Sequence, residues 1–507
     1  MKKTRVFSVL LGSVIFITAC TPSAKPNHAS PNMTVEISDT EPLDCMDSLP
    51  SNLTPKFQGD LEQLCSAPMY TLDIALNQDG ENFRVTGTQQ VAYTNQELEP
   101  LEAIYFKLVP NMGGDYLAVS DVRVDDEVVE PQLEYDSTVL RLDLPDLLAP
   151  GQLATINMDI DVLVPLEMGG NYGLFVYMDE ILALDAFFPI IPVYNDEGWN
   201  VESPPQNADV IFSDAAFFSV TVDAPADFVI AAGGQETDQR MDGDRQVISY
   251  KAGPQREFYL AASPRFVTAS REVDGVIITS YFPEANRTSG EDVLETAVFA
   301  LQAFSDRFGA YPYTELDLVS TPMRAGGMEY SSITALGLYL YDMESTLDGG
   351  LPASAFLEAA TAHEIAHMWF YCQVMNDQID HPWQDESLVQ YATYLYYLDR
   401  YGDENARGFL ASFYDRWNRV GQEPISIGLR AANYEGSEYG AIIYGRGALM
   451  FDAMRAVMGA DVFDQFLADY VNIYRWAVVE PEDLLNIAEA ICDCDLTDVY
   501  MEYGLRD

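Results

Sequence analysis

The sequence predicts an α+β protein with an antiparallel β-sandwich domain followed by a mainly helical domain. Two patterns carry this prediction. Short alternating apolar runs broken by turn residues fill residues 67–264, and apolar residues at helical spacing dominate from about residue 285 onward. The 507-residue chain is also too long for a single hydrophobic core. We therefore expect at least two domains, with a boundary in the region 265–285.

The N-terminal β domain is expected over residues 66–270. Apolar and polar residues alternate in stretches such as STVLRLDLP and ATINMDIDVLVP, with Asp-Gly and Pro between the runs. A period of two turns one face of each strand toward a core, and frequent turn signals favour antiparallel neighbours. No long helical pattern interrupts the runs, so a sandwich is the expected architecture.

The C-terminal domain is expected over residues 271–507. The segment SGEDVLETAVFALQAFSDRF, which begins at Ser289, has apolar residues at helical spacing. Further helices are predicted over residues 355–371, 387–401, 436–458 and 462–474. This domain is therefore expected to be mainly helical.

The first twenty residues, MKKTRVFSVLLGSVIFITAC, are typical of a secretory signal. A basic start precedes an apolar run from Val6 to Ile17, which is too short to span a bilayer comfortably. The run ends in ITAC, which resembles the lipobox of bacterial lipoproteins, whose cysteine is lipidated. We expect a signal peptide over residues 1–19 and a lipid anchor at Cys20 that holds the protein at a membrane of the cell envelope. The alternative is an ordinary signal with an incidental cysteine.

Residues 20–65 are expected to form a flexible tether, because Pro, Ser, Thr, Asn and Asp dominate their first part. An exported protein can form disulfides, and Cys45 with Cys65 is the expected bridge. Cys492 and Cys494 are either bridged or free. Cys372 is expected to be a buried thiol.

The charge of the chain excludes one class of partner. The 80 acidic and 27 basic residues give a formal net charge of -53. Such a chain repels nucleic acid, so no nucleic-acid function is expected. A solvated acidic surface is the simplest explanation of the composition.

The stretch HEIAHMWF, residues 363–370, holds two of the 4 histidines of the chain. On a helix, His363 and His367 lie on one face, where two imidazoles can bind one metal ion beside Glu364 as a general base. The alternative is a buried helix with satisfied histidines, which explains the apolar neighbours but not the charged glutamate. We therefore predict a zinc site.

A catalytic zinc site needs a third protein ligand. The next segment, HPWQDESLVQYATYLYYLDR, begins a new helix with Glu386 near its start. His381 is a rival, because imidazole is the commoner ligand, but it precedes a proline in an expected turn. Glu386 is therefore the predicted third ligand of one Zn²⁺ per chain.

These motifs together resemble the gluzincin metallopeptidases of the aminopeptidase N-like family. HEIAHMWF and WQDESL have the family order, with eighteen residues between His367 and Glu386. GGMEY at residues 326–330 resembles the exopeptidase motif, and YGRGALMFDAM at residues 444–454 resembles the tyrosine-bearing helix. The resemblance covers about residues 67–507 and implies a thermolysin-like catalytic domain behind the β domain.

The resemblance also implies roles for single residues. It makes His363, His367 and Glu386 the zinc ligands and Glu364 the base that activates water for attack on a peptide carbonyl. Tyr444 falls on the family tyrosine whose hydroxyl stabilises the oxyanion.

The resemblance further implies which end of a peptide enters the site. Glu329 falls on the glutamate that binds the free α-amino group of the substrate in aminopeptidases. Gly326 and Gly327 allow close backbone approach of an extended peptide. The family often has a second amine-binding residue before a Phe-Pro pair, and counting back from residues 188–189 gives Glu180, with Asp179 as the nearest competitor.

Three departures from the family pattern affect these expectations. Tyr330 replaces an asparagine, and Gly445 and Arg446 replace Glu-Lys. The sequence also has no room for the large helical C-terminal domain of the longest members. A more open site that admits larger peptides is the expectation that follows.

The predicted function is that of a zinc-dependent aminopeptidase that acts on peptides with a free N-terminus. A gluzincin endopeptidase is one alternative, and a catalytically silent peptide-binding lipoprotein is another. Blocking the substrate amine would stop cleavage by an aminopeptidase but not by an endopeptidase. The silent protein is disfavoured because the ligands, the base and the tyrosine are all present.

Overall fold

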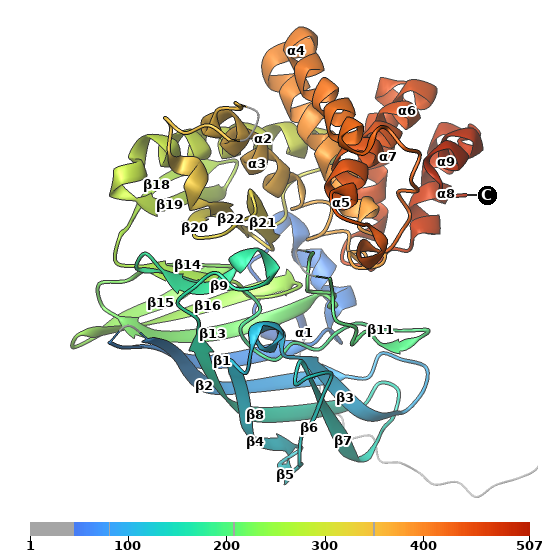
Figure 1. Cartoon of the computed structure of the whole chain (residues 1–507). Coiled ribbons are helices and arrows are strands. Elements are labelled where there is room, and N and C mark those ends of the chain that lie inside the picture. Colours follow the sequence, from blue (N-terminus) through green and yellow to red (C-terminus); the bar gives the residue numbers. More distant parts are fainter. Residues whose placement is uncertain (1–44, 81, 206–207, 348–349, 507) are drawn as a thin grey trace, which may run out of the picture. The chain divides into compact units, whose positions relative to one another are not determined.

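The computed structural model describes residues 45–506 with the exception of 81, 206–207 and 348–349 (Figure 1). The predicted signal peptide, Cys20 and the first part of the tether lie outside the described residues. Among the helices that the structure describes, none combines the length and apolar character needed to cross a membrane. The predicted lipid anchor therefore stays a prediction.

The structure contradicts a flexible tether over residues 45–65. This segment forms α1 (Cys45–Ser48) and the 3-10 helix η1 (Pro55–Leu64), and the predicted Cys45–Cys65 disulfide joins its two ends. Phe57 and Leu61 are only 4% and 2% exposed, because they pack into the core of the helical domain. The few apolar side chains of this polar segment are thus enough to anchor it.

An eight-stranded sheet forms the base of the N-terminal domain. Its strands follow the order β15-β16-β13-β1-β2-β8-β4-β5. Their bounds are Met69–Asp79 for β1, Asn82–Thr94 for β2, Leu117–Val124 for β4, Glu127–Val128 for β5, Leu153–Val164 for β8, Ala216–Pro225 for β13, Gln235–Asp242 for β15 and Arg245–Gln255 for β16. All neighbours pair antiparallel except β1 and β13, which are parallel.

Smaller sheets cover the large one and complete the predicted sandwich. One sheet has the order β14-β17-β10-β9 and the other has the order β3-β7-β6. Their bounds are Val229–Ala232 for β14, Leu260–Ser263 for β17, Ile181–Leu184 for β10, Phe175–Met178 for β9, Leu101–Lys107 for β3, Val139–Leu148 for β7 and Gln132–Glu134 for β6. A short hairpin adds β11 (Tyr194–Asn195) and β12 (Gly198–Trp199). The inward side chains of the alternating strands form one continuous core.

The C-terminal domain begins with a five-stranded mixed sheet that helical periodicity did not predict. Its order is β18-β19-β20-β22-β21, with β18 at Phe266–Val273, β19 at Val276–Pro283, β20 at Glu315–Thr321, β21 at Gly327–Tyr330 and β22 at Ile333–Gly337. Because β18 already pairs with β19, the domains meet between β17 and β18, a few residues before the predicted boundary at 270/271. Strand β21 lies at the edge of this sheet.

Helices make up the rest of the domain (Figure 1). The longer helices are α2 (Arg287–Phe308), α3 (Ala353–Ala366), α4 (Leu388–Trp417), α6 (Ala448–Met458), α7 (Ala460–Tyr474), α8 (Pro481–Cys492) and α9 (Thr497–Tyr503). Short helical segments of this domain are η4 (Glu284–Asn286), η5 (Leu338–Tyr341), η6 (Trp383–Ser387), η7 (Asn418–Val420), η8 (Ala431–Asn433), α5 (Glu438–Ala441) and η9 (Ile442–Gly447). The β domain contains η2 (Val109–Gly113) and η3 (Asn171–Gly173). The predicted two-part α+β architecture is confirmed.

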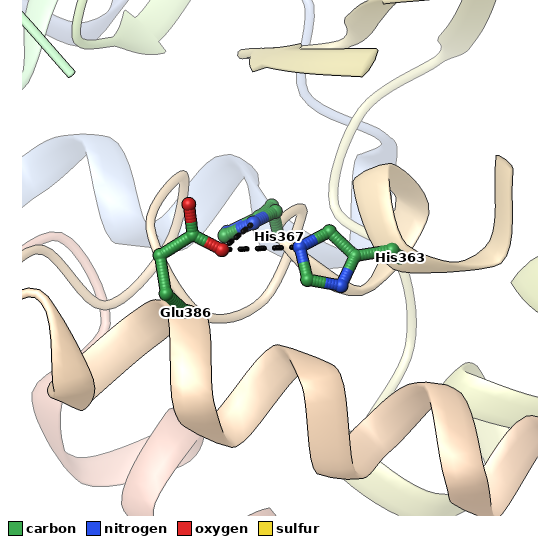
Figure 2. Close-up of side chains that lie close together, drawn as sticks. All are labelled: His363, His367 and Glu386. Carbon is green, nitrogen blue, oxygen red and sulfur yellow. Dashed lines mark hydrogen bonds and ion pairs between the residues drawn. The ribbon is translucent and has the colours of Figure 1, made fainter. Parts of the chain in front are cut away.

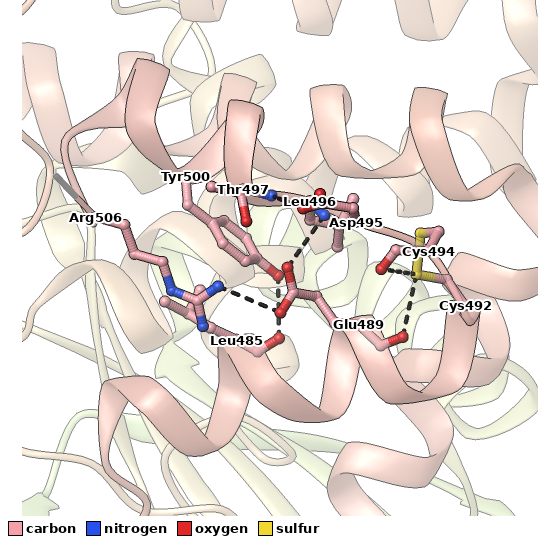
Figure 3. The surroundings of a disulfide bond; sticks show 9 residues. All are labelled: Leu485, Glu489, Cys492, Cys494, Asp495, Leu496, Thr497, Tyr500 and Arg506. Atoms are coloured by element: carbon pink, nitrogen blue, oxygen red, sulfur yellow. Dashed lines mark hydrogen bonds and ion pairs between the residues drawn. A yellow bond between two sulfur atoms is a disulfide. The ribbon is translucent and has the colours of Figure 1, made fainter.

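A second disulfide joins Cys492, the last residue of α8, to Cys494, so the bridged alternative is the correct one (Figure 3). Next to it, Glu489 accepts hydrogen bonds from the backbone N–H of Leu496 and from Arg506. Cys372 is free and buried, as predicted. These contacts hold α9 against α8.

A small core joins the two domains beside β21. Tyr259 of the β domain stacks on Tyr330 of β21 with ring centroids 4.0 Å apart. Glu257, also from the β domain, accepts hydrogen bonds from the Ser331 backbone N–H and from the Tyr371 hydroxyl. The β domain therefore positions the loop and strand on which the predicted amine-binding glutamate lies.

Candidate metal and catalytic site

Helix α3 carries His363, and His367, the other predicted histidine ligand, caps its C-terminal end. The helix packs against β21 and β22 on one side and against α2 and α4 on the other, so it is buried around most of its circumference. His363 and His367 lie one turn apart with ring centroids separated by 5.0 Å. The buried helix and the metal-ligand pair, which the sequence left as alternatives, are thus both present.

Glu386 brings the third ligand group to these histidines from the π-helical turn η6 (Figure 2). Its Oε2 lies 3.1 Å from His363 Nε2 and 3.6 Å from His367 Nε2. The ligand atoms of all three residues lie within 4.8 Å of one another. His381 does not belong to this group, so the carboxylate is the better third ligand.

The three side chains fit a tetrahedral divalent metal ion such as zinc. The ring Nδ1 of His367 lies 3.1 Å from the Phe370 carbonyl oxygen, to which its N–H can donate. The other ring nitrogen, Nε2, is buried 3.6 Å from Glu386 Oε2 and has no hydrogen-bond partner among the described residues, so it is available to a metal ion. An imidazole held by a carbonyl, with its other nitrogen free, is the usual arrangement of a zinc ligand.

The electrostatics of the site also favour a bound cation. Burial alone would lower the pKa of His367, but the negative charges of Glu329 and Glu386 raise it well above its ordinary value. Burial would raise the pKa of Glu386, and the two histidines more than offset that effect and lower it. Several buried carboxyl groups thus compete for two imidazoles, and a divalent cation would relieve their repulsion.

Glu364 lies directly against the edge of the sheet. A Cβ atom on Gly327 would come within 2.4 Å of Glu364 Oε1, so only glycine leaves room for this carboxylate. A Cβ on Gly326 would similarly meet the Phe356 ring at 2.8 Å. The two glycines therefore make space for α3, a reason that the sequence analysis did not give. Burial and the neighbouring charge of Glu329 raise the pKa of Glu364 well above its ordinary value.

Tyr444 reaches the metal ligands from the second π-helical turn, η9. Its hydroxyl donates a hydrogen bond to Glu386 Oε1 at 2.5 Å. The turns η6 and η9 meet closely, because Ser387 donates to the Ile443 carbonyl and a Cβ on Gly447 would lie 2.0 Å from Ser387 Oγ. Tyr444 is therefore placed at the ligand group, as the family resemblance implied.

Glu329 belongs to a buried acidic group beside His367. Gln378 donates hydrogen bonds from its Nε2 to Glu329 Oε1 at 3.0 Å and to Asp385 Oδ2 at 2.8 Å. Burial raises the pKa of Glu329 to about 7, and the nearby carboxylates Glu386 and Asp385 add to this effect. Gln378 and Asp385 were missed by the sequence analysis, because a buried amide bridge has no sequence pattern.

The assignment of Glu180 is wrong. Glu180 and its competitor Asp179 lie on the exposed turn between β9 and β10, where their side chains face solvent. The β-domain carboxyl groups that do line a small cavity with Glu329 are Asp185 and Asp209. Counting along the chain failed because the turn directs its side chains away from the cavity, whereas Asp185 follows β10 toward it.

Asp185 and Asp209 are 4% and 9% exposed, and both stand at the same cavity as Tyr330 and Gln378. Burial raises the pKa of Asp185 to about 7, while the adjacent Tyr330 hydroxyl lowers it. Burial and the charge of Glu329 raise the pKa of Asp209 well above its ordinary value. This end of the site is therefore rich in acidic groups that a cationic ligand would stabilise.

Comparisons with known proteins agree with this geometry. Residues 293–503 match the model of the peptidase family M1 domain. Aminopeptidase M1 of Arabidopsis thaliana is 24% identical over 294 residues, which are 54% of this chain and 32% of the plant protein. Aminopeptidase M1-B of Oryza sativa subsp. japonica is 25% identical over 294 residues, with the same coverage. The matched part thus spans about a third of the length of these relatives.

Solved structures show the same fold over most of the chain. An M1 zinc metallopeptidase from Deinococcus radiodurans aligns with a TM-score of 0.63 at 20% identity and covers 87% of this chain and 95% of its own. A structure of that enzyme bound to a Tyr-Ser-Ala substrate aligns with a TM-score of 0.61 at 21% identity, covering 87% and 94%. The β-rich domain and the helical domain are therefore those of an M1 metallopeptidase fold. The resemblance to the aminopeptidase N-like gluzincins is confirmed, and the chain carries a peptidase family M1 domain.

Proposed function

We propose that the protein is a zinc-dependent aminopeptidase that hydrolyses N-terminal residues from peptides. The observation that carries this proposal is the convergence of two groups in one place. The ligand group of His363, His367 and Glu386 lies beside a buried acidic cavity that contains Glu329. The first group suits hydrolysis, and the second suits a substrate with a free amine. The zinc metallopeptidase and aminopeptidase names of the relatives support the same proposal.

The metal would be held by His363, His367 and Glu386. When bound, zinc lowers the pKa of a water molecule and polarises a carbonyl group. Glu364, pressed against Gly327, accepts the proton of the attacking water and returns it to the leaving amine. Burial and the charge of Glu329 raise the pKa of this carboxyl group, which favours its uptake of a proton.

Tyr444 stabilises the negative charge that develops on the carbonyl oxygen. Burial and the charge of Glu386 raise the pKa of its hydroxyl well above the ordinary value, so it stays protonated and can donate a hydrogen bond. Its position at Glu386 places that donor at the ligand group. Such donors lower the activation free energy of acyl transfer by about 3 kcal/mol.

The substrate amine would lie in the acidic cavity. A protonated α-amino group pairs there with Glu329, which Gln378 holds in place, and with Asp185 in the role first assigned to Glu180. The free edge of β21 allows an extended peptide to pair with the sheet next to Glu364. The amine contact fixes the distance to the scissile bond and so limits cleavage to the first residue.

The decisive experiment compares substrates with a free and an acetylated N-terminus. The purified protein should contain about one zinc per chain, release the first residue of free peptides and leave acetylated peptides intact. Glu364→Gln should keep the zinc and lose turnover. Equal cleavage of both substrates would favour the endopeptidase alternative, and zinc binding with no turnover of any peptide would favour the silent one.

We also propose that the chain is exported and anchored by a lipid on Cys20 in the cell envelope. The support is the sequence MKKTRVFSVLLGSVIFITAC alone, because these residues lie outside the described part. Membrane fractionation and mass analysis of the N-terminal peptide test this proposal. Cys20→Ser should release the protein from the membrane fraction without a change in peptidase activity, and an unmodified Cys20 would contradict the anchor.

A further inference from the structure

Arg416, near the end of α4, is a cation beside the catalytic tyrosine. Its guanidinium carbon lies 5.9 Å from the centroid of the Tyr444 ring. The Tyr444 ring in turn lies 5.9 Å from the His363 ring. The Tyr444 ring is thus a common neighbour of the His363 ring and of the Arg416 guanidinium.

Arg416 has no anionic partner in the part of the chain that the structure describes. No carboxylate pairs with it, and its guanidinium makes no hydrogen bond there. This is unexpected in a protein with 80 acidic residues and 27 basic ones. Arg307, by contrast, pairs with both Asp399 and Asp464. A partly buried cation without a counterion costs free energy, unless a ligand supplies the missing charge.

The charges around the ligand group are polarised. Glu329 lies on the side of His367, since the ligand atoms of Glu329, Glu364 and His367 lie within 4.8 Å of one another. Arg416 lies against the Tyr444 ring, which itself lies 5.9 Å from the His363 ring. A short peptide at neutral pH has the matching arrangement, with an ammonium group at one end and a carboxylate at the other. An extended residue spans about 3.3–3.6 Å, so a second or third residue would bring its carboxylate to the guanidinium.

We propose that Arg416 binds the C-terminal carboxylate of short peptides, so that the enzyme prefers di- and tripeptides with both termini free. This inference rests on the proposed aminopeptidase function. The planar guanidinium offers two parallel N–H donors that match a carboxylate. The proposed contact predicts a preference for short peptides. This is the opposite of the open site for larger peptides that the sequence suggested, because each added residue moves the carboxylate past Arg416.

The kinetic test compares Leu-Gly-Gly with its C-terminal amide. The wild-type enzyme should cleave the free acid with a kcat/KM about tenfold higher or more, mainly through KM, because charged hydrogen bonds are made only to the acid. Arg416→Gln should remove this preference, and Arg416→Lys should restore part of it. Arg419→Gln is the matched control, because Arg419 is an exposed neighbour in η7, and it should keep the preference.

A binding test on Glu364→Gln does not depend on turnover. Calorimetry should show that this variant binds the free acid about tenfold more tightly than the amide and that adding Arg416→Gln abolishes the difference. Equal binding of acid and amide would overturn the inference. So would an equal loss of activity on both substrates in Arg416→Gln, which would mean that Arg416 acts through Tyr444. Cleavage of N-acetylated peptides would instead contradict the aminopeptidase proposal, and the acid-amide comparison would still be measurable.

Discussion

Two groups of buried or half-buried carboxyl groups can be compared. The site carboxyls are Glu329, Glu364, Asp385, Glu386 and Asp209, and the β20 carboxyls are Glu315 and Asp317. Burial raises the pKa to about 7 both for Glu329 in the first group and for Glu315 in the second. The site carboxyls surround two imidazoles, whereas Asp317 faces the Tyr281 hydroxyl. Burial and a raised pKa alone therefore do not mark a functional site.

The two groups also arise differently from the sequence. Glu315 and Asp317 are two residues apart on one strand and so share one face of β20. The site carboxyls come from the β domain, from β21, from α3 and from η6. Only convergence of several elements places carboxylates next to histidine nitrogens. Substitutions of the site carboxyls should therefore lower activity, whereas those of the β20 carboxyls should change stability.

The largest effect is expected for Glu364→Gln. Losing the general base should reduce kcat by about 10²- to 10⁴-fold, while zinc content and thermal stability stay close to those of the wild type. Glu315→Gln is the matched control from the β20 carboxyls and should retain activity. Steady-state kinetics with metal analysis measure both. Loss of activity in a folded Glu315→Gln would show that the β20 carboxyls also contribute to catalysis.

The next largest effect is expected for Tyr444→Phe. Removing the hydroxyl takes away an oxyanion donor and should lower kcat by about 10²- to 10³-fold with little change in KM. The hydroxyl also donates to Glu386, so zinc affinity is measured in parallel with a competing chelator. A large fall in zinc affinity with full activity at saturating zinc would assign Tyr444 to metal binding instead.

A smaller effect is expected for Glu329→Gln. This change removes the charge that pairs with the substrate amine, so kcat/KM on free peptides should fall about ten- to hundredfold, mainly through KM. Asp317→Asn, from the other group, should leave KM unchanged. The test is to measure KM for free peptides in the wild type, Glu329→Gln and Asp317→Asn. An unchanged KM in Glu329→Gln would mean that this glutamate does not bind the substrate amine.

The β20 carboxyls should instead affect stability with pH. Burial, with the charge of Glu236 added, raises the pKa of Glu315 from 4.5 to about 7. A raised carboxyl pKa favours folding while the group is protonated, so its contribution is lost as pH rises from about 4.5 through 7. Glu315→Gln should therefore raise Tm relative to wild type at pH 8 but not at pH 5. The exposed Glu62→Gln is the control, and an equal shift at both pH values would contradict the assignment.

The smallest effect is expected from salt. With a formal net charge of -53, the exposed carboxylates repel one another, and added NaCl screens that repulsion. Tm should rise by a few degrees between low and moderate salt, and by the same amount in the wild type, Glu329→Gln and Glu315→Gln. Differential scanning calorimetry tests this, since a variant-specific salt effect would show that one of the buried groups is open to solvent ions.

Much of the site could be predicted from local sequence patterns. The four-residue spacing of His363 and His367 is a property of any α-helix, so the sequence alone determines that they share a face. Glu386 was found because the next helix begins there and zinc needs a third ligand. The two-part architecture followed from periods of two and 3.6 residues, which are set by strand and helix geometry.

Tertiary structure decided everything that depends on contacts between distant residues. Asp185, Asp209 and Gln378 reach Glu329 from separate parts of the chain, and one aspartate among 80 acidic residues carries no signal of its own. Glu180 was misplaced because a count along the chain does not say which way a turn directs its side chains. The unpaired state of Arg416 is equally invisible in sequence. Electrostatic and packing energies depend on distance in space, and only the folded chain sets those distances.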